Sequence, residues 1–542
     1  MKVSINKEFI NTDKKILHEL VRELYPKSYK KYILSNINGK IEDLNYKISP
    51  NDEILLIDKS SHISNLSYES SIALVCILAI KKIYKNIKVN VEYSVNNCLY
   101  LSIDGFKVLH NDLSKIKKEM NNIIKKDIPF FREFYTKDDA LKIFKNSNQL
   151  DKYNLLKSID TDGIGIYKIL GECFSFTNLL CPKSSWIEDF DLIYYYPGIL
   201  INFKKDKDSK LLDFKEQVNI PKIYERSKRW TNLLGINYAS DLNNLVRSNK
   251  IESLINVNET YYNNQLSKCA KDIISNDMNI VMLAGPSSSG KTTTAKKLAI
   301  QLAVLGKDAF VISTDDYFVD RDKTPLDTNG NKDYESIDAI DLNSLNEDLL
   351  NLLEGKEVIL PSFNFIKGIR TLSNKKITMK ENTVLIIEGI HALNPKLTDY
   401  IPEKNKYKIY VSVLTGINID STNRISSSET RLIRRIVRDN KYRGYNTLET
   451  LKSWDKVKYG EERYIFPYQN RADFYVDSSL IYEYNALKKY AMECLNQVSN
   501  DSRYFYIVDR LKNILSYFVN MKDTKVIDDN SILREFIGED ND

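Results

Sequence analysis

Residues 285–292 read Gly-Pro-Ser-Ser-Ser-Gly-Lys-Thr and carry the strongest signal in the C-terminal half of the chain. It fits the pattern GxxxxGK[ST], whose glycines let backbone N–H groups curl around phosphate oxygens. Lys291 supplies a positive charge for the terminal phosphates, and the hydroxyl of Thr292 is a ligand that suits Mg²⁺. The motif therefore predicts a phosphate-binding loop.

The sequence on both sides of this loop has the order that such a loop needs. The apolar run NIVMLAG precedes it as a strand, and alanines and leucines at helical spacing follow it until Gly306. The apolar runs DAFVIS, TVLIIE, YKIYVSV and DFYVD come next, separated by helical segments. This alternation predicts an α/β domain over residues 276–495, with a mostly parallel sheet covered by helices on both faces.

Two carboxylates, Asp315 and Asp316, follow the next predicted strand in the stretch VISTDDYFVDRD. A carboxylate at the C-terminal end of a parallel strand can take the proton of an acceptor hydroxyl or align it for in-line attack. The alternative is that both carboxylates cap the following helix. The sequence has no NKxD guanine-binding motif and no DEAD-type helicase set, which favours a small-molecule kinase over a GTPase or a helicase.

An arginine-rich segment lies further along the chain. Arg431, Arg434, Arg435 and Arg438 are spaced so that all four lie near one helical face, and Arg443 follows in a Lys/Arg/Gly turn. Planar guanidinium groups match the charge that spreads over phosphate oxygens during phosphoryl transfer, and a hinged arginine lid excludes water. The alternatives are a solvated charged face and an RNA-binding face.

Six segments in this order resemble the uridine kinase/phosphoribulokinase family over about residues 275–490. They read GPSSSGKTTTAKKLA, STDDYF, DYESIDAID, LPSFNF, VLIIEGIHAL and RLIRRIVRDNKYRG. The resemblance implies ATP and Mg²⁺ as cofactors, with Thr292 and Glu388 at the metal. The catalytic residues it implies are Asp315, Lys291, Arg434, Arg438 and Arg443. The residues expected to hold the nucleotide are Gly285, Ser287, Ser288, Ser289, Gly290, Lys291, Thr292 and Thr293.

The resemblance also implies an acceptor site, and here the sequence departs from the family. The residues expected to bind the acceptor are Glu335, Phe363, Phe365, Arg370 and Arg431. Glu335 stands where Asp is usual, Phe363 and Phe318 stand where Tyr is common, and Gly368 replaces a base-contacting His. Uridine is the leading acceptor, and another small hydroxyl compound, such as a free or phosphorylated sugar, is the alternative. The alternative interpretation of the two phenylalanines of LPSFNF is that they are ordinary core residues.

The N-terminal half resembles two modules of threonyl-tRNA synthetases. Residues 1–60, with an Asn-Gly turn between extended runs, resemble a TGS domain of β-grasp type. Residues 63–203, which contain SYESSIALVCILAIKKIYKNIKVNVEYSVNNCLYLSI, resemble the second additional domain, an α+β module that carries an HxxxH editing site. Ser70 and Leu74 occupy the two histidine positions and only Cys181 is kept, so metal-dependent editing is not expected.

Two further segments complete the predicted organisation. Residues 205–275 are expected to be a helical connector with a packing role, and residues 496–542 a C-terminal helix and tail. The chain of 542 residues carries 79 Lys+Arg and 73 Asp+Glu, a net charge of +6 that does not indicate a polyanion-coating protein.

The six cysteines lack CxxC spacing and the N-terminus lacks an apolar signal core, which predicts a reduced, cytoplasmic protein without a membrane span. The leading function is a nucleoside kinase. The competing function is an RNA- or tRNA-linked regulator that uses the phosphate-binding loop as a nucleotide sensor, since the relatives of the N-terminal modules touch tRNA. The sequence leaves open whether the chain forms a homo-oligomer.

Overall fold

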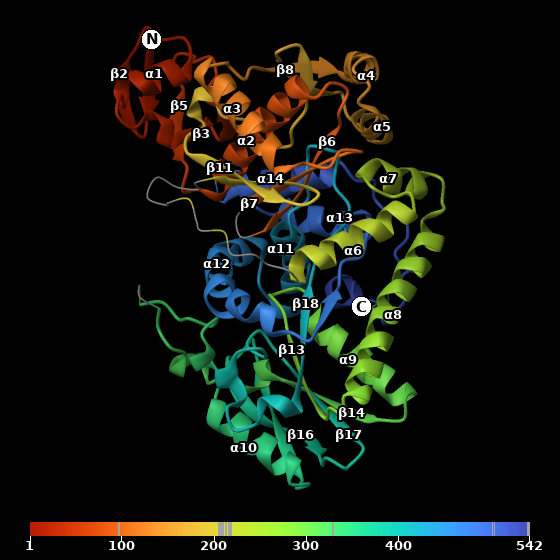
Figure 1. Ribbon diagram of the computed structural model, residues 1–542. Helices are drawn as coiled ribbons and strands as arrows, with labels where there is room; N and C mark the ends of the chain where they lie inside the picture. Colours follow the sequence, from red (N-terminus) through yellow and green to blue (C-terminus); the bar gives the residue numbers. More distant parts are fainter. Residues whose placement is uncertain are drawn as a thin grey trace.

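The computed structural model describes residues 1–95, 98–203, 211, 214, 219–327, 330–500, 502 and 504–538. It is elongated, with the N-terminal half at one end and the phosphate-binding domain at the other (Figure 1). Helices from the C-terminal part of the chain lie between these two ends and touch both. The two ends of the molecule are therefore connected by packed helices.

Residues 1–60 form a five-stranded sheet in the order β2-β1-β5-β3-β4, packed on α1. Strands β3 and β4 form the predicted hairpin. Asn38 and Gly39 have φ values of +51° and +87°, which the tight turn requires and which Asn and Gly tolerate best. The elements are β1 (Lys2–Ile5), β2 (Glu8–Asn11), α1 (Leu17–Leu24), β3 (Tyr32–Ile37), β4 (Lys40–Asp43) and β5 (Glu53–Asp58).

The next 140 or so residues surround the long helix α2 (His62–Ile83). By length and composition α2 could cross a membrane, but 78% of its apolar window is buried inside the protein, as in a core helix. It lies with a four-stranded sheet, β11-β12-β7-β6, and a three-stranded sheet, β10-β9-β8. The other elements are β6 (Val89–Val95), β7 (Cys98–Ile103), α3 (His110–Lys125), β8 (Arg132–Thr136), α4 (Lys137–Asn146), α5 (Leu150–Ser158), β9 (Gly163–Ile169), β10 (Glu172–Phe174), β11 (Phe190–Tyr195) and β12 (Gly198–Phe203).

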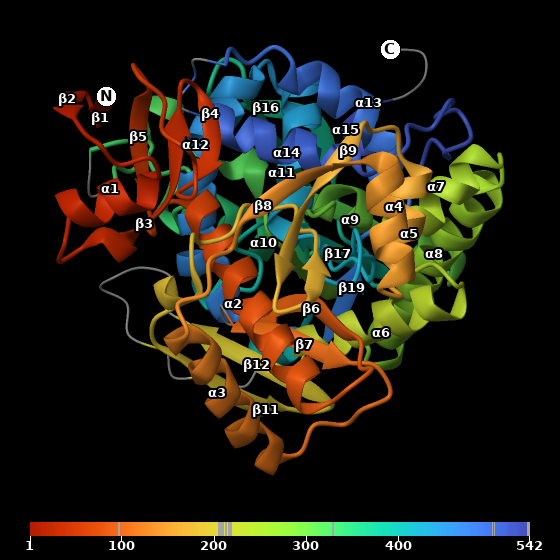
Figure 2. The ribbon, with the colours of Figure 1, turned by 90° about the horizontal axis from the view of Figure 1, so that it is seen from above.

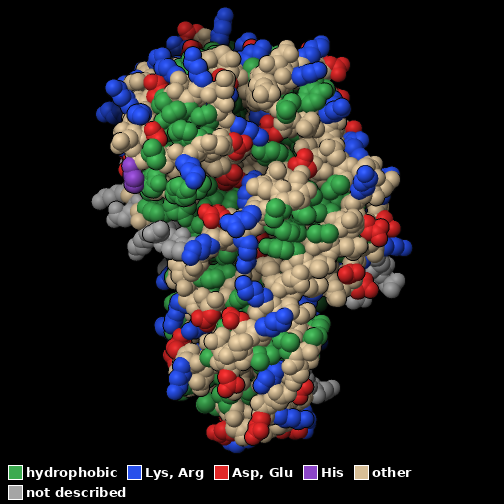
Figure 3. Space-filling model, turned by 45° about the vertical axis from the view of Figure 1, so that its right-hand side comes forward, with side chains coloured by type: hydrophobic (Ala, Val, Ile, Leu, Met, Phe, Trp, Pro, Cys, Tyr) green, Lys and Arg blue, Asp and Glu red, His purple; other side chains and the backbone are tan. Residues whose placement is uncertain are grey.

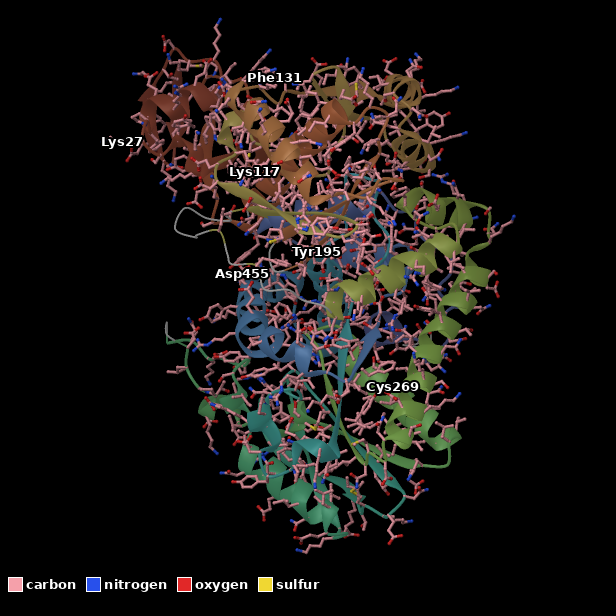
Figure 4. All side chains as sticks on the ribbon, in the orientation of Figure 1. Lys27, Lys117, Phe131, Tyr195, Cys269 and Asp455 are labelled. Atoms are coloured by element: carbon pink, nitrogen blue, oxygen red, sulfur yellow. The ribbon has the colours of Figure 1, made fainter. Side chains whose placement is uncertain are left out.

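Three helices, α6 (Asn219–Leu233), α7 (Ala239–Arg247) and α8 (Ile251–Ser275), connect the two ends along one side of the molecule (Figures 1 and 2). Cys269, labelled in Figure 4, lies on α8 and is fully buried. Tyr262 Oη, on the same helix, lies 2.7 Å from Thr294 Oγ1 behind the phosphate-binding loop. The connector therefore packs against the helix that follows this loop.

The C-terminal domain contains a five-stranded sheet in the order β14-β17-β13-β18-β19, in which every neighbouring pair is parallel. The central strand β13 (Ile280–Ala284) shows why the apolar run is continuous. Val281 and Leu283 belong to one hydrophobic cluster, and Ile280, Met282 and Ala284 to another on the opposite face. The predicted α/β domain with a parallel sheet is confirmed.

The remaining elements surround this sheet and supply the site. The strands are β14 (Asp308–Ser313), β17 (Thr383–Glu388), β18 (Lys406–Ser412) and β19 (Phe474–Asp477), with an antiparallel hairpin of β15 (Val358–Asn364) and β16 (Ile369–Ile377). The helices are α9 (Lys291–Val304), α10 (Leu342–Leu353), α11 (Ser427–Arg438), α12 (Thr447–Gly460), α13 (Glu483–Leu495), α14 (Phe505–Ser516) and α15 (Arg534–Ile537).

Candidate active site

The phosphate-binding loop joins β13 to α9 in the left-handed backbone conformations that a nest of N–H groups needs. Ser288 and Gly290 have φ values of +58° and +80°. A Cβ on Gly285 would lie 2.4 Å from Val411 O and 2.7 Å from Ser289 Oγ, so only glycine fits there. The hydroxyl groups of Ser288 and Ser289 are buried without a hydrogen-bond partner in the described chain, which suits an anion in the loop.

The predicted metal ligands are brought together at the ends of three elements. Thr292 Oγ1, on the first turn of α9, donates to Glu388 Oε1 at 2.9 Å, and Ser313 Oγ donates to the same oxygen at 2.9 Å. Lys291 Nζ points back over the loop to Pro286 O at 3.2 Å. Hydroxyl and carboxylate oxygens of this kind are what Mg²⁺ takes when phosphates supply its other ligands, so the residues fit the implied metal.

Glu388 is buried, with 3% of its surface exposed. Burial, together with the negative charge of Asp315, raises the pKa of Glu388 to about 7, against the opposing effect of Lys291. A cation next to this carboxylate would favour its charged form. A cation bound beside Glu388 would therefore lower this raised pKa.

Asp315 and Asp316 follow β14 directly and differ in their surroundings. Asp316 Oδ1 accepts a hydrogen bond from the backbone N–H of Phe363 at 3.2 Å, so this carboxylate holds the β15–β16 hairpin. The side-chain carboxylate of Asp315 makes no hydrogen bond or ion pair with the other residues that the structure describes. Its charge acts on Glu388 on one side and on Glu335 and Arg443 on the other. Asp315 thus lies between the metal side and the acceptor side of the site.

Aromatic residues form a wall on the acceptor side. The rings of Phe318 and Phe363 meet edge to face at 5.7 Å between centroids, and those of Phe363 and Phe365 at 5.3 Å. Both phenylalanines of the hairpin are half-buried, unlike ordinary core residues. The guanidinium of Arg443 lies 4.7 Å from the centroid of the Phe365 ring. The arginine-rich segment therefore reaches the aromatic wall.

The structure gives a physical reason for the glycine at position 368. Gly368 has a φ of +70°, and a Cβ there would lie 2.6 Å from Nε of Arg321. Arg321 Nη2 donates to Phe365 O at 2.6 Å, and its backbone N–H donates to Gly368 O at 2.8 Å. A guanidinium thus takes the space next to the hairpin turn. Arg370, two residues further on, forms an ion pair with Asp341, with Nη2 and Oδ2 2.7 Å apart.

Glu335 lies on the loop before α10 and packs against Gly460, whose added Cβ would be 2.4 Å from the Glu335 Cβ. Burial raises the pKa of Glu335 to about 7; Arg435 opposes the shift, and Glu461 and Asp315 add to it. His391 lies close by and is 1% exposed, with its ring beside the backbone of Glu335 and Ser336. Burial lowers the pKa of His391 to about 4, so the ring is neutral.

Helix α11 carries two arginines, Arg431 and Arg435, to the phosphate-binding loop. Arg435 Nη1 donates to Ser287 Oγ at 3.0 Å, and Arg431 Nη1 donates to Ser287 O at 3.2 Å. Arg431 also forms a two-pronged ion pair with Glu461. Arg435, Arg438 and Arg443 surround the single carboxylate of Asp439. Three guanidinium groups on one carboxylate leave an excess of positive charge beside the phosphate-binding loop.

Arg434 is a correction to the predicted catalytic set. Its side chain is fully buried, Nε donates to Glu483 Oε2 at 2.6 Å and Nη2 donates to Ser478 O at 2.9 Å. The guanidinium also lies over the ring of Phe536, 5.2 Å from its centroid. Helical spacing placed Arg434 near its neighbours, but the side chain points into the packing of α11 on α13 and has a structural role here.

Three acidic residues of the site, Glu461, Asp439 and Glu535, were not predicted from a sequence motif. Glu461 accepts the backbone N–H of Ser287 at 3.2 Å, and Asp439 gathers the arginines; each begins a π-helical turn, a feature common at functional sites. Glu535 Oε2 accepts the hydroxyl of Thr293 at 2.7 Å. The C-terminal segment also places Ile532 against Gly290. The π-helical turns at Asp439 and Glu461 mark this part of the site in the structure, but helix propensity does not predict such turns from the sequence.

The groove beside Ser70 and Leu74, the positions of the two histidines in the HxxxH editing motif, is nearly filled. Ser70 Oγ accepts a hydrogen bond from Asn178 Nδ2 at 2.8 Å, while Leu74 and Cys181 are fully buried. Residues 422–424 of the C-terminal domain line the same groove, and the cavity that remains is about 20 Å³, space for about one water molecule. No cluster of three or more His, Cys, Asp or Glu able to hold a metal occurs among the described residues.

Part of the C-terminal half matches a known protein family. Residues 280–480 match the Phosphoribulokinase / Uridine kinase family. A uridine kinase from Staphylococcus haemolyticus is 28% identical over 198 residues, which cover 36% of this chain and 86% of that protein. A solved structure described as a "Possible Uridine Kinase" from Bacillus stearothermophilus has a TM-score of 0.27 and 19% identity, and covers 40% of this chain and 98% of that one.

The N-terminal region matches a different class. A threonine–tRNA ligase from Carboxydothermus hydrogenoformans is 29% identical over 178 residues, which cover 32% of this chain. The matched part is 28% of that ligase, so this chain spans little more than a quarter of its length. The chain thus combines a threonine–tRNA ligase-like N-terminal region with a C-terminal kinase-family domain, which supports a phosphotransferase.

Proposed function

We propose that this protein transfers the terminal phosphoryl group of ATP to the hydroxyl of a nucleoside, with uridine as the first candidate. The observation that carries the proposal is the position of Asp315. It follows a parallel strand of the kinase sheet, its carboxylate makes no hydrogen bond or ion pair with the described residues, and its charge acts on both Glu388 and Glu335. A carboxylate between a phosphate site and an acceptor wall is suited to an acceptor hydroxyl.

Each group of this chain has a definite task in that reaction. ATP supplies the phosphoryl group and Mg²⁺ neutralises part of its charge. The loop and Lys291 would bind the phosphates, and Thr292 with Glu388 would hold the metal. Asp315 takes the proton of the acceptor hydroxyl or aligns it, and Arg435, Arg438 and Arg443 stabilise negative charge on the transferred group. No covalent enzyme intermediate is needed.

The acceptor pocket favours a planar group with attached hydroxyls. The wall of Phe318, Phe363 and Phe365 offers an aromatic surface, and Glu335 offers a carboxylate to hydroxyl groups. Arg321 and Arg443 add positive charge at this wall. That charge keeps a phosphorylated sugar as the alternative acceptor, because a guanidinium pairs with phosphate as well as it stacks on a ring.

A panel of acceptors tests the proposal. Acceptor-dependent ADP formation should be largest with uridine or another nucleoside, smaller with free sugars, and absent with Lys291→Ala. A sugar phosphate as the best substrate would replace the nucleoside as acceptor and leave the kinase in place. ADP formation that no acceptor stimulates would remove the kinase proposal.

A second candidate function is a tRNA-linked regulator in which the loop senses nucleotide. The match of 178 residues to a threonine–tRNA ligase favours it. On the face shown in Figure 3, however, Lys and Arg side chains are interspersed with Asp and Glu, unlike a surface that coats a polyanion. Salt-sensitive tRNA binding without acceptor-dependent ADP release would support the regulator.

A further inference from the structure

A loop of the kinase-family domain is held by the N-terminal region. The loop, residues 413–426, joins β18 to α11. Its Asp420 forms an ion pair with Lys152 of α5, with Oδ1 and Nζ 2.9 Å apart and both side chains 2% exposed. Asp420 also accepts the backbone N–H groups of Thr422 and Asn423, so it shapes the loop. The positive charge that balances this carboxylate therefore comes from Lys152 of the N-terminal region.

The neighbouring loop residues are bound in the same way. Ser421 donates its N–H to Asp151 Oδ2 at 2.8 Å and accepts the N–H of Val91 at 2.8 Å. Asn423 accepts the N–H of Thr177 at 2.8 Å and donates to Ser175 O at 3.0 Å. In these mostly buried hydrogen bonds the loop residues act both as donors and as acceptors. Such a network holds the loop in one position against the N-terminal region.

The loop leads directly into the arginine helix. Arg424 forms an ion pair with Glu69 of α2 at 2.7 Å, and α11 begins three residues later at Ser427. Arg431 and Arg435, one and two turns further on, contact Ser287 of the phosphate-binding loop. The loop that enters α11 is therefore anchored to the N-terminal region, while the middle of the helix carries the guanidinium groups.

We propose that the N-terminal region positions the arginine helix for phosphoryl transfer, with Lys152 as the main positioning residue. The proposal rests on the kinase function proposed above. A helix transmits a displacement of its first turn to its later side chains, and a misplacement of about 1 Å in a catalytic arrangement can cost about 100-fold in rate. The N-terminal region then acts as a part of the kinase and not as a separate enzyme.

Lys152→Met tests the proposal, because it leaves Asp420 buried without its counter-charge. We expect kcat to fall between about 10- and 100-fold, with the KM for the acceptor and for ATP changed less than about twofold. Adding Asp420→Asn to this variant removes the unpaired charge and should recover most of the loss. Arg424→Met, at a more exposed pair of the same loop, provides a milder variant that should fold in any case, with a smaller fall in kcat.

Lys59→Met is the matched control. Lys59 is also a nearly buried lysine of the N-terminal region, paired with Glu188 at 2.9 Å, but it does not touch the loop. It should lower thermal stability and leave kcat of the folded protein unchanged. Equal kcat in Lys152→Met and Lys59→Met, corrected for the folded fraction, would overturn the proposal and leave the interface a purely stabilising contact.

Hydrogen exchange separates this proposal from the assigned activity. Amides of α11 should exchange faster in Lys152→Met than in the unmodified chain, and at the normal rate in Lys59→Met. This result does not depend on which acceptor is phosphorylated or on whether one is. Unchanged exchange in α11 would refute the positioning role, whereas absent turnover in the unmodified chain would refute the kinase proposal alone.

Discussion

The phosphate-binding site and the groove beside Ser70 both gather polar side chains, but they differ in how far other side chains of the protein engage them. At the phosphate-binding loop, the hydroxyl groups of Ser288 and Ser289 are buried and unpartnered within the described chain. In the groove, Ser70 accepts a hydrogen bond from Asn178, Glu69 pairs with Arg424 and Glu429 pairs with Arg510, and about 20 Å³ of space remains. A site built to take a ligand keeps unsatisfied groups, whereas a site turned into an interface satisfies them.

The same contrast separates two adjacent arginines. Arg435 contacts Ser287 of the loop, while Arg434 is fully buried against Glu483. One guanidinium faces the site and the other belongs to the packing, although they are consecutive residues. The predictions below test whether this division between ligand-facing and structural groups is real.

The largest effect is expected at Lys291. Lys291→Ala should lower acceptor-dependent turnover by about 10³-fold or more, because the charge on the phosphates is needed most in the transition state. Lys296→Ala, an exposed lysine on the same helix, is the matched control and should behave like the unmodified chain. Steady-state kinetics with both variants give the answer; near-normal kcat in Lys291→Ala would remove the loop from the mechanism.

The two arginines should fail in different ways. Arg435→Met should lower kcat by about 10²-fold and keep the free energy of unfolding. Arg434→Met should lower that free energy by about 3–5 kcal/mol, because Glu483 would stay buried without its partner. Denaturant titration beside kinetics measures both; a folded, fully stable Arg434→Met with collapsed activity would return Arg434 to the catalytic set.

The pKa of Glu388 predicts a smaller, pH-dependent effect. The folded protein holds a proton on Glu388 up to a pKa of about 7, so the carboxylate becomes available to a cation only as pH rises through that value. The apparent KM for Mg²⁺ should rise about tenfold for each pH unit below 7. Glu335→Gln should keep this dependence and Glu388→Gln should lose it. A KM for Mg²⁺ that is flat between pH 5.5 and 8 in the unmodified chain would disprove the assignment.

The same raised pKa has a consequence for stability. Charging a buried carboxylate is unfavourable, so this group's contribution to the free energy of unfolding is complete at low pH and is lost as pH rises through about 7. Mg²⁺ should reduce that loss.

No effect is expected from metal removal in the N-terminal region. Ser70 and Leu74 cannot replace two histidines, and the groove beside them is filled. The purified full chain should contain less than stoichiometric zinc by elemental mass spectrometry, and it should not release serine from mischarged tRNA. Either stoichiometric zinc or such release would show that the groove is still a site.

The parts of the site that the sequence predicts well are contiguous. The loop with Lys291 and Thr292 depends on eight consecutive residues, and the parallel sheet depends on apolar runs that stay buried on both faces. Asp315 could be expected at the site because it follows a strand of that sheet. The predicted ranges of the five domains and the nucleoside as acceptor stay predictions.

The parts that the sequence could not predict depend on contacts between distant segments. Helical spacing puts Arg434 and Arg435 close together but does not say which one faces the loop. Ser421 binds Asp151 across 270 residues of sequence, and Glu535 reaches Thr293 across 242. Such pairs leave no local pattern, because each partner alone is an ordinary surface residue until the fold buries it.

The most direct measurement compares Asp315→Asn with Asp316→Asn. Asparagine is nearly isosteric with aspartate but cannot take a proton, and Asp316 is engaged by the N–H of Phe363. Single-turnover phosphorylation should fall by about 10²–10⁴-fold in Asp315→Asn with unchanged ATP affinity, and only slightly in Asp316→Asn. Equal small effects, or a large loss at Asp316 alone, would contradict the account.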